Sequence, residues 1–372
     1  MRLCRQYWLF ISITLPSLFF AQEFQIHGLA SGWFSANASR VQPGIRYIPE
    51  FTIDQQFNDN LNGNITVALH AYSTAQFVEH QQPLYNTSMK PYRLWGKVAS
   101  DEFEARIGLQ KINFGSAVLL RPLMWFDAID PRDPLQMTDG VYALLMRWYF
   151  SGNSNIWLWG LYGNNERKGL EVFPSKHNSP EFGGRFQSPV GSGELGATYH
   201  HRNADMKVFS PSLRPSEEDR YALDGKWDIG IGVWFETVII HRSISVPSLQ
   251  YQRMWTIGAD YTFGIGNGLN VLTEYFRTEN PLSAFGSSGG PGFSAVSVSY
   301  PLSLLDRISV MVYRDWKNND WYRLASVQRT YDSLTFYLLG FWNPQTILIP
   351  QQQSGKASFA GTGIQFMTAV NH

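Results

Sequence analysis

Apolar and polar residues alternate along much of the chain, in short segments with a period of two. In the segment 44–55, Ile45 and Tyr47 fall on one parity, whereas Arg46 and Glu50 fall on the other. Successive side chains of a β-strand point to opposite faces, so this alternation predicts strands with one apolar and one polar face. The pattern recurs along the chain and predicts an all-β protein.

The alternating segments predict about eighteen strands, with sixteen as the alternative count. They are expected near residues 24–34, 44–55, 62–76, 90–98, 102–111, 140–150, 154–164, 181–188, 193–201, 218–228, 230–240, 251–263, 268–277, 292–300, 305–314, 321–330, 334–342 and 361–372. An even count is typical of bacterial membrane barrels.

The links between these segments alternate between short and long. Short links such as "SGNSN" near 152 follow even-numbered strands, whereas longer stretches such as 77–89, 112–139 and 165–180 follow odd-numbered strands. A soluble β-sandwich would also give alternating strands, but it does not require alternating link lengths. A membrane barrel does, because it has short turns on one side and longer loops on the other. The sequence therefore predicts a transmembrane, antiparallel, up-and-down β-barrel.

Composition fits this class. Of the 372 residues, 16% are charged and 15% are aromatic, which is low and high respectively for a soluble domain. Lysine plus arginine number 30 and aspartate plus glutamate number 30, so no basic excess indicates nucleic acid. After the N-terminal segment, no apolar run of about eighteen residues predicts a membrane helix.

The N-terminus has the layout of a secretory signal peptide. Arg2 and Arg5 precede an apolar run over 7–20, which ends at the small residue Ala21. We therefore expect a signal peptide over 1–21 and a single barrel domain over 22–372, located in the bacterial outer membrane; an uncleaved anchor is the alternative. Cleavage would remove the only cysteine, so no disulfide or thiolate metal site is expected.

The stretch 112–140 mixes apolar and charged residues and fits neither a strand nor a water-facing loop. Its apolar part, 119–126, suits packing against the barrel wall, and its "DPRD" part suits water. We expect this loop to fold into the lumen and form a pore constriction. Its candidate residues are Lys111, Arg121, Asp127, Asp130, Arg132 and Asp133. These charges would set up a transverse field in the pore, or would instead anchor the loop to the wall by salt bridges.

Charged residues on the inward parity of several strands are candidates for the pore wall. They are Arg46, Glu50, Arg93, Lys97, Glu104, Arg106 and Arg147. Basic residues among them suit anionic or polyhydroxylated solutes, although any water-filled barrel needs a polar lining. No cofactor or metal site is expected. The aspartates at 127, 130 and 133 lack the spacing of an EF-hand calcium loop.

The chain resembles the porin-like barrels of Gram-negative outer membranes. The motif resemblance rests on 108–115, "GLQKINFG", and on 127–134, "DAIDPRDP", which look like the strand end and loop of eighteen-stranded substrate-selective porins and alginate-export-type barrels. This resemblance implies that the third external loop constricts the lumen. It also implies an aromatic assembly signal at the C-terminus, where this chain departs from the family by ending in His372.

These observations predict a passive outer-membrane channel for small hydrophilic solutes, without catalysis. The expected partners are outer-membrane lipid, the solutes, periplasmic chaperones and the barrel-assembly machinery, and homo-oligomers are left open. One alternative is a barrel component of a polymer-export or assembly machine. Another is an outer-membrane hydrolase, because the run 286–290 matches G-x-S-x-G. That run sits among further glycines rather than at a strand-to-helix elbow, which favours a plain loop.

Overall fold

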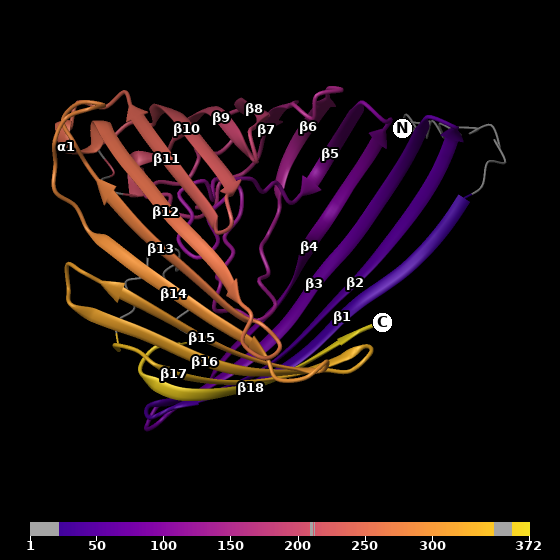
Figure 1. The fold of residues 1–372 in the computed structure, drawn as a ribbon, viewed down its shortest axis with the longest axis vertical. Helices are drawn as coiled ribbons and strands as arrows, with labels where there is room; N and C mark the ends of the chain where they lie inside the picture. The colour runs from indigo at the N-terminus through magenta and orange to yellow at the C-terminus, as the bar shows by residue number, and fades with distance from the viewer. Residues whose placement is uncertain (1–21, 209–210, 212, 346–358) are drawn as a thin grey trace, which may run out of the picture.

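The chain forms a closed antiparallel barrel in a computed structural model, which describes residues 22–208, 211, 213–345 and 359–372 (Figure 1). The predicted signal peptide lies outside these residues and stays a prediction. The strands are β1 (Gln22–Asn37), β2 (Arg40–Asn58), β3 (Leu61–Val78), β4 (Leu84–Ala99), β5 (Phe103–Gln110), β6 (Val141–Tyr149), β7 (Asn155–Leu161), β8 (Glu181–Val190), β9 (Gly193–Ala204), β10 (Ser216–Asp228), β11 (Gly232–Arg242), β12 (Tyr251–Phe263), β13 (Leu269–Glu279), β14 (Gly292–Pro301), β15 (Asp306–Asp315), β16 (Asp320–Thr330), β17 (Leu334–Trp342) and β18 (Thr362–Asn371).

Each strand pairs with its neighbours in sequence, and β1 closes the ring against β18. The closing register runs from Leu29 opposite Asn371 to Asn37 opposite Gly363. The prediction of an eighteen-stranded, up-and-down barrel is therefore confirmed. A short helix, α1 (Pro247–Gln250), and a 3-10 turn, η1 (Met206–Val208), lie in the links on either side of β10 and β11. Among the described residues, no helix is both long and apolar enough to span a bilayer.

The first four strands are longer than predicted. The stretch 77–89 was expected to be a long loop, but β3 and β4 continue through most of it and leave only 79–83 as their link. The prediction of a long link was wrong there because the ladder continues past the last clear apolar alternation, with Gln76 still opposite Leu84. Polar side chains such as Asn86 are tolerated at the barrel rim, where both faces meet water.

The two ends of the barrel differ in their links. We call the end with the links 59–60, 100–102, 191–192 and 229–231 the turn end, and the opposite end the loop end. The loop end carries the long links 111–140, 162–180 and 343–361, which follow β5, β7 and β17. The predicted alternation of link lengths thus holds for most of the barrel. Its exceptions at the loop end include 38–39 and 316–319.

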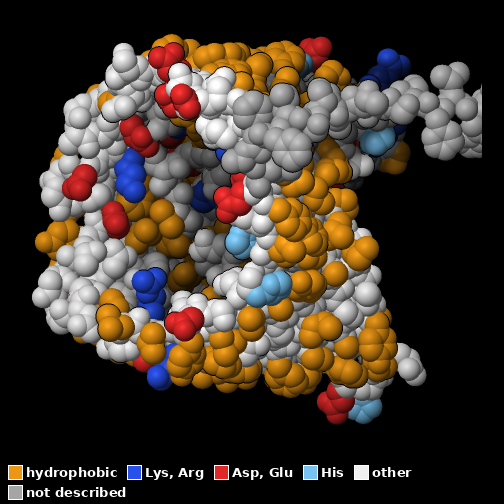
Figure 2. Space-filling model, turned by 90° about the vertical axis from the view of Figure 1, so that its right-hand side faces the viewer, with side chains coloured by type: hydrophobic (Ala, Val, Ile, Leu, Met, Phe, Trp, Pro, Cys, Tyr) orange, Lys and Arg blue, Asp and Glu red, His pale blue; other side chains and the backbone are white. Residues whose placement is uncertain are grey.

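The outer surface of the barrel carries many large apolar side chains. Ile45 is 66% exposed and Ile107 is 64% exposed, although both are large aliphatic residues. Figure 2 shows hydrophobic side chains over the outer face and charged side chains around a hollow in the middle of the molecule. The predicted parity of the strands is therefore the parity that the fold adopts.

The segment 111–140, here called the inner loop, joins β5 to β6 and supplies most of a core inside the barrel. In Figure 1 it is the purple coil that runs between β4 and β12. Ile112, Leu120 and Leu123 are at most 2% exposed and belong to one cluster with inward-facing apolar residues of the wall. Those wall residues include Trp159 of β7, Trp234 of β11, Met254 of β12 and Phe276 of β13. One side of the lumen is thus filled by packed side chains.

Candidate constriction in the lumen

The inner loop is attached to the opposite wall by its backbone. Glu274 of β13 accepts hydrogen bonds from the backbone N–H groups of Val118 at 2.7 Å, Leu119 at 2.9 Å and Leu120 at 2.6 Å. It also accepts one from the indole N–H of Trp234, at 3.0 Å. Charge-assisted bonds of this kind are stronger than neutral ones. One carboxylate therefore satisfies consecutive N–H groups of a turn that has no strand partner.

A second carboxylate holds the two ends of the same turn. Glu236 of β11 accepts hydrogen bonds from the N–H of Ala117 at 2.8 Å and of Leu123 at 3.0 Å. Between the two acids, Thr256 of β12 donates its hydroxyl to the carbonyl of Leu120 at 2.7 Å. Three adjacent strands thus contribute one polar side chain each. We call Glu236, Thr256 and Glu274 the anchor residues.

A glycine lets the inner loop approach the first anchor. Gly115 has φ +98°, a backbone conformation that residues with a side chain rarely adopt. A Cβ atom at this position would lie 2.3 Å from Oε1 of Glu236 and 3.0 Å from Cβ of Leu123. Neither the conformation nor the space admits another residue. The close approach of this turn to β11 therefore requires Gly115.

Aromatic side chains fix the other flank of the inner loop against β7 and β9. Phe114 stacks on Trp159 with ring centroids 5.6 Å apart, and Phe126 meets the same indole edge-on at 5.4 Å. Trp159 donates its N–H to Nδ1 of His200, whose Nε2 lies 3.1 Å from a carboxylate oxygen of Glu181. His200 is thus a fully bonded part of the wall. The apolar half of the loop packs on the wall as the sequence predicted.

The predicted constriction charges do not share one environment. Arg121 and Asp127 form a buried ion pair at 3.1 Å within the loop, and the Arg121 guanidinium also bonds Asn113 at 2.5 Å. Arg132 is buried as well and pairs with Asp130 at 2.7 Å. A buried, paired guanidinium presents little charge to a passing solute. Both pairs, Arg121 with Asp127 and Arg132 with Asp130, lie within the inner loop, so neither is the predicted salt bridge between the loop and the wall.

The remaining predicted constriction residues reach open space to a greater degree. Lys111 and its neighbour Asn113 are exposed, and Asp133 is half-buried and bonds the N–H of Leu135 at 3.0 Å. Desolvation lowers the pKa of the Lys111 amine, while the nearby Asp127 carboxylate acts in the opposite direction. Lys111 is therefore the predicted constriction cation that the loop leaves exposed.

The end of the inner loop contacts strands that precede β5 in the chain. Arg93 donates to the carbonyl of Thr138 at 3.1 Å, and Lys90 forms an ion pair with Asp139 at 2.6 Å. The Arg46 guanidinium lies 2.9 Å from the sulfur of Met137 and 5.0 Å from the ring of Trp33. The loop thus contacts the wall at β2 and β4 as well as at β11 to β13.

The predicted wall residues are all half-buried on the inward parity, and two strand registers bring some of them together. Glu104 of β5 lies opposite Arg147 of β6, and its carboxylate contacts Arg147 at 3.4 Å and Arg106 at 3.2 Å. Lys97 of β4 lies opposite Arg106. These residues form one positive group around a single acid. Glu50 lies apart from them on β2, opposite Ala68.

A second loop covers the wall beside the inner loop. Residues 162–180 follow β7, and Gly169 donates its N–H to the carbonyl of Asp127 at 2.9 Å. Glu171 of this loop contacts Arg202 of β9 at 2.9 Å and Arg220 of β10 at 2.7 Å. The two arginines, together with Arg242, also bind Glu218 of β10. This buried network holds the second loop over β9 to β11.

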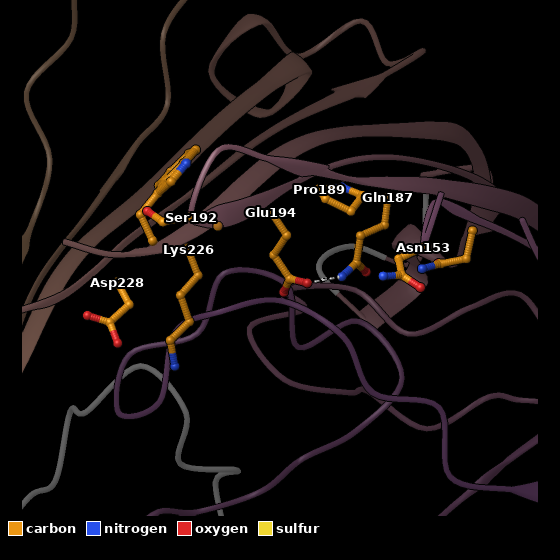
Figure 3. Close-up of a pocket in the computed structure, with 10 residues that line it drawn as sticks. Asn153, Gln187, Pro189, Ser192, Glu194, Lys226 and Asp228 are labelled. Carbon is orange, nitrogen blue, oxygen red and sulfur yellow. Dashed lines mark hydrogen bonds between the residues drawn. The ribbon is translucent and has the colours of Figure 1, made fainter. Parts of the chain in front are cut away.

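The turn end of the lumen contains a cavity of about 350 Å³ (Figure 3). Glu194 accepts a hydrogen bond from Gln187 at 2.5 Å across its wall, drawn as a dashed line in the figure. Lys226 and Asp228 line the same cavity and extend from β10. Charges of both signs therefore border the lumen on this side of the inner loop.

Sequence reasoning missed the anchor residues. The alternation in β11 and β13 places Glu236 and Glu274 on the inward face of the wall, but it does not predict their contact with the inner loop, because the loop contributes backbone groups that carry no sequence signal. One signal was present in the wall itself. The inward neighbours of Glu274 on β13 are Leu272 and Phe276, so it is a lone carboxylate on an apolar face. Such a group needs a buried partner.

The side chains of the described residues contain no group of three or more His, Cys, Asp or Glu that could hold a metal ion. Asp127 and Asp130, two of the three aspartates considered for calcium, each bind an arginine. His200 and His201 point to opposite faces of β9, since His200 is buried inside and His201 bonds Asp219.

No protein-family model and no curated protein matches the chain. Solved structures do match it over nearly its whole length. OccD3 (OpdP) of Pseudomonas aeruginosa is 9% identical with a TM-score of 0.60, and the match covers 95% of this chain and 92% of that chain. OmpF of Salmonella typhi, solved in complex with daunomycin, is 13% identical with a TM-score of 0.50, covering 94% and 97%.

A third match has the same extent. OmpT of Vibrio cholerae, an outer membrane protein solved as a loop L8 deletion mutant, is 10% identical with a TM-score of 0.50, covering 95% of this chain and 100% of that chain. Identities this low establish the fold alone. The chain therefore has the porin-like barrel fold, and its function must be argued from its own residues.

Proposed function

We propose that this protein is an outer-membrane channel for the passive diffusion of small hydrophilic solutes, constricted by the inner loop. The observation that carries the proposal is the attachment of that loop across the lumen by Glu236 and Glu274. A loop that is hydrogen-bonded to the far wall narrows the water-filled lumen. The same bonds keep the loop from collapsing and closing the lumen. Pore selectivity then depends on the side chains beside the loop.

The lining of the free part of the lumen favours polar solutes, and among them anions. Arg46, Arg93 and Lys111 have no carboxylate within ion-pair distance among the described residues. Arg106 and Arg147 share the single carboxylate of Glu104. Positive groups gathered along one wall raise the local concentration of anions. Strong anion selectivity is nevertheless not expected, since the whole chain has a formal net charge of +0.

The same proposal includes the predicted partners and the absence of catalysis. The apolar outer face suits outer-membrane lipid. The last residue, His372, exchanges backbone hydrogen bonds with Gly28 at 2.8 and 3.0 Å, and its ring stacks on Tyr47. The imidazole of His372 thus packs against β1 and β2 beside the end of β18. The G-x-S-x-G run lies in the 280–291 link, apart from any strand-to-helix elbow.

Planar bilayers test the channel function. The purified full-length protein, shown to be folded by heat-dependent gel mobility, is expected to insert with discrete conductance steps. A folded barrel without such steps would refute the channel and favour the alternative of a sheath or export component. In that case, the anchored loop would serve as a plug rather than a constriction.

A further inference from the structure

Four arginines face outward from the barrel near its loop end. They are Arg253 of β12, Arg277 of β13, Arg314 of β15 and Arg323 of β16, here called the outer arginine patch. On each strand, the residue adjacent to the arginine is buried in the barrel interior; these residues are Met254, Phe276, Tyr313 and Leu324. Because side chains alternate along a strand, the arginines point away from the lumen. They therefore play no part in lining the channel.

The patch is continuous across neighbouring strands. Arg277 lies opposite Trp255, and Arg314 lies opposite Trp321. Between these pairs, Trp316 donates its backbone N–H to Gly292 and its indole N–H to Ser294 at 2.8 Å. The guanidinium groups thus alternate with large rings on one surface. Tryptophan at this level of a membrane protein marks the boundary between hydrocarbon and headgroups.

The patch has a positive excess. Glu279 is its one paired acid, and it binds both Arg253 and Arg277, the latter at 2.7 Å. Arg314 lies 4.7 Å from the ring of Trp321 and bonds the carbonyl of Asn319, whereas Arg323 is exposed. Neither has a carboxylate within ion-pair distance among the residues described. The guanidinium groups of Arg314 and Arg323 therefore keep N–H donors that the described residues of the barrel do not use.

The opposite end of the same strands is different. Phe263 and Leu304 are exposed there, and Leu304 is fully so. The outward arginine at that end, Arg329 of β16, lies 3.7 Å from Asp306 and 5.2 Å from the ring of Tyr331. Unneutralised outward arginines thus gather at the loop end of these strands. If these arginines served only as general cations at a membrane interface, we would expect them at both ends of the strands.

We propose that the outer arginine patch binds the phosphate groups of a glycolipid headgroup in the outer leaflet of the membrane. This rests on the proposed location, with the loop end outside, but not on the channel activity. Guanidinium groups bind phosphate through two parallel hydrogen bonds, and their stacking on indoles orients them in advance. The acyl chains would lie on the apolar strand faces directly below.

Native mass spectrometry of the detergent-solubilised full-length barrel tests this site. The probes are bis-phosphorylated lipid A, the same glycolipid without its phosphates, and inorganic phosphate. We expect lipid A to bind in discrete adducts, and the dephosphorylated form to bind about tenfold more weakly, as charge-assisted contacts are lost. The double variant Arg314→Gln with Arg323→Gln is expected to lose the same preference.

Arg329→Gln provides the matched control, because it removes an outward arginine from the same strand β16 at the turn end. It is expected to bind lipid A like the unaltered protein. Equal binding of both glycolipids, or an unchanged preference in the double variant, would overturn the proposal. Displacement of lipid A by inorganic phosphate would assign the patch to free phosphate instead. Conductance of the same variants, measured separately, reports on the channel, so the two proposals fail independently.

Discussion

Glu274 holds the inner loop through hydrogen bonds to backbone N–H groups, so its acceptor capacity is what matters. Replacing it with glutamine turns one acceptor oxygen into an NH₂ donor facing the N–H groups of Val118, Leu119 and Leu120. Leaving such groups unsatisfied costs about 1–3 kcal/mol each. We expect Glu274→Gln to produce a noisier open channel with larger conductance fluctuations, recorded in single-channel traces.

Glu194→Gln is the control for this substitution. Glu194 also faces the lumen, but it bonds Gln187 near the turn end and does not contact the inner loop. Its substitution should leave the noise unchanged. Quiet, unaltered traces from a folded Glu274→Gln protein would show that the loop does not depend on this anchor.

The ion pair of Arg121 and Asp127 gives a prediction about stability. Both side chains are buried, so Asp127→Asn leaves a guanidinium without its counter-charge, which costs about 3–5 kcal/mol. We expect the unfolding temperature in heat-mobility gels to fall for this variant. The double replacement Arg121→Met with Asp127→Leu should recover most of the loss. A single variant as stable as the parent would show that the pair is solvated.

Residue roles were only partly predictable from the sequence. The inward position of Arg106 and Arg147 followed from strand parity, because parity is a local property. The pairing of Arg121 with Asp127, rather than with the pore, depends on how the loop turns, and alternation does not encode that. The anchors at 236 and 274 depend on contacts between segments far apart in sequence, made to backbone groups that are the same in every residue.

At the scale of elements, the inner loop both narrows the lumen and covers apolar wall. Deleting 116–136 removes the turn held by the anchor residues and the side chains packed on Trp234 and Phe276. We expect a higher single-channel conductance from this deletion, measured in planar bilayers. We also expect lower thermal stability, because the inward apolar residues would then face water.

Shortening the 280–291 link between β13 and β14 is the comparison for the deletion. That link also lies at the loop end, but it does not belong to the apolar cluster inside the barrel. Shortening this link should change the single-channel conductance little. If the 116–136 deletion conducted no better than the parent, the inner loop would not be the narrowest element.

The elements themselves were largely predictable, because each strand carries its own alternation of apolar and polar residues. The number of strands and the position of the long link after β5 followed directly. The lengths of β1 to β4 did not, since the rim of a barrel exposes both faces of a strand and removes the periodic signal. The link 79–83 was therefore overestimated.

At the scale of the whole molecule, several wall cations have no paired carboxylate among the described residues, and this arrangement predicts a moderate preference for anions. Replacing Arg46 and Arg93 with glutamine removes positive charge from one wall, and we expect the reversal potential in a salt gradient to shift toward cations. Arg329→Gln, which faces outward, should leave that potential unchanged. A parent channel that prefers cations would contradict the assignment of this wall as the solute path.

Lys111 makes the preference depend on pH. Desolvation lowers the pKa of its amine below the ordinary lysine value, against the opposing effect of Asp127. The amine is charged below this lowered pKa and neutral above it, so anion preference should decline at a less alkaline pH than an ordinary lysine would give. Lys111→Arg should keep the preference through the same range in reversal-potential measurements. Identical pH profiles for the two proteins would exclude Lys111 from the path.

The attachment of the inner loop to the wall does not depend on most of the loop's side chains. Glu236 and Glu274 accept hydrogen bonds from backbone N–H groups, which every residue except proline supplies, and the close approach to β11 requires a glycine at position 115. The exposed positions of the loop, such as Lys111 and Val118, can therefore be exchanged without releasing it. The same barrel and anchor residues can therefore hold inner loops with different exposed side chains, and so with different solute selectivity, in natural or designed variants.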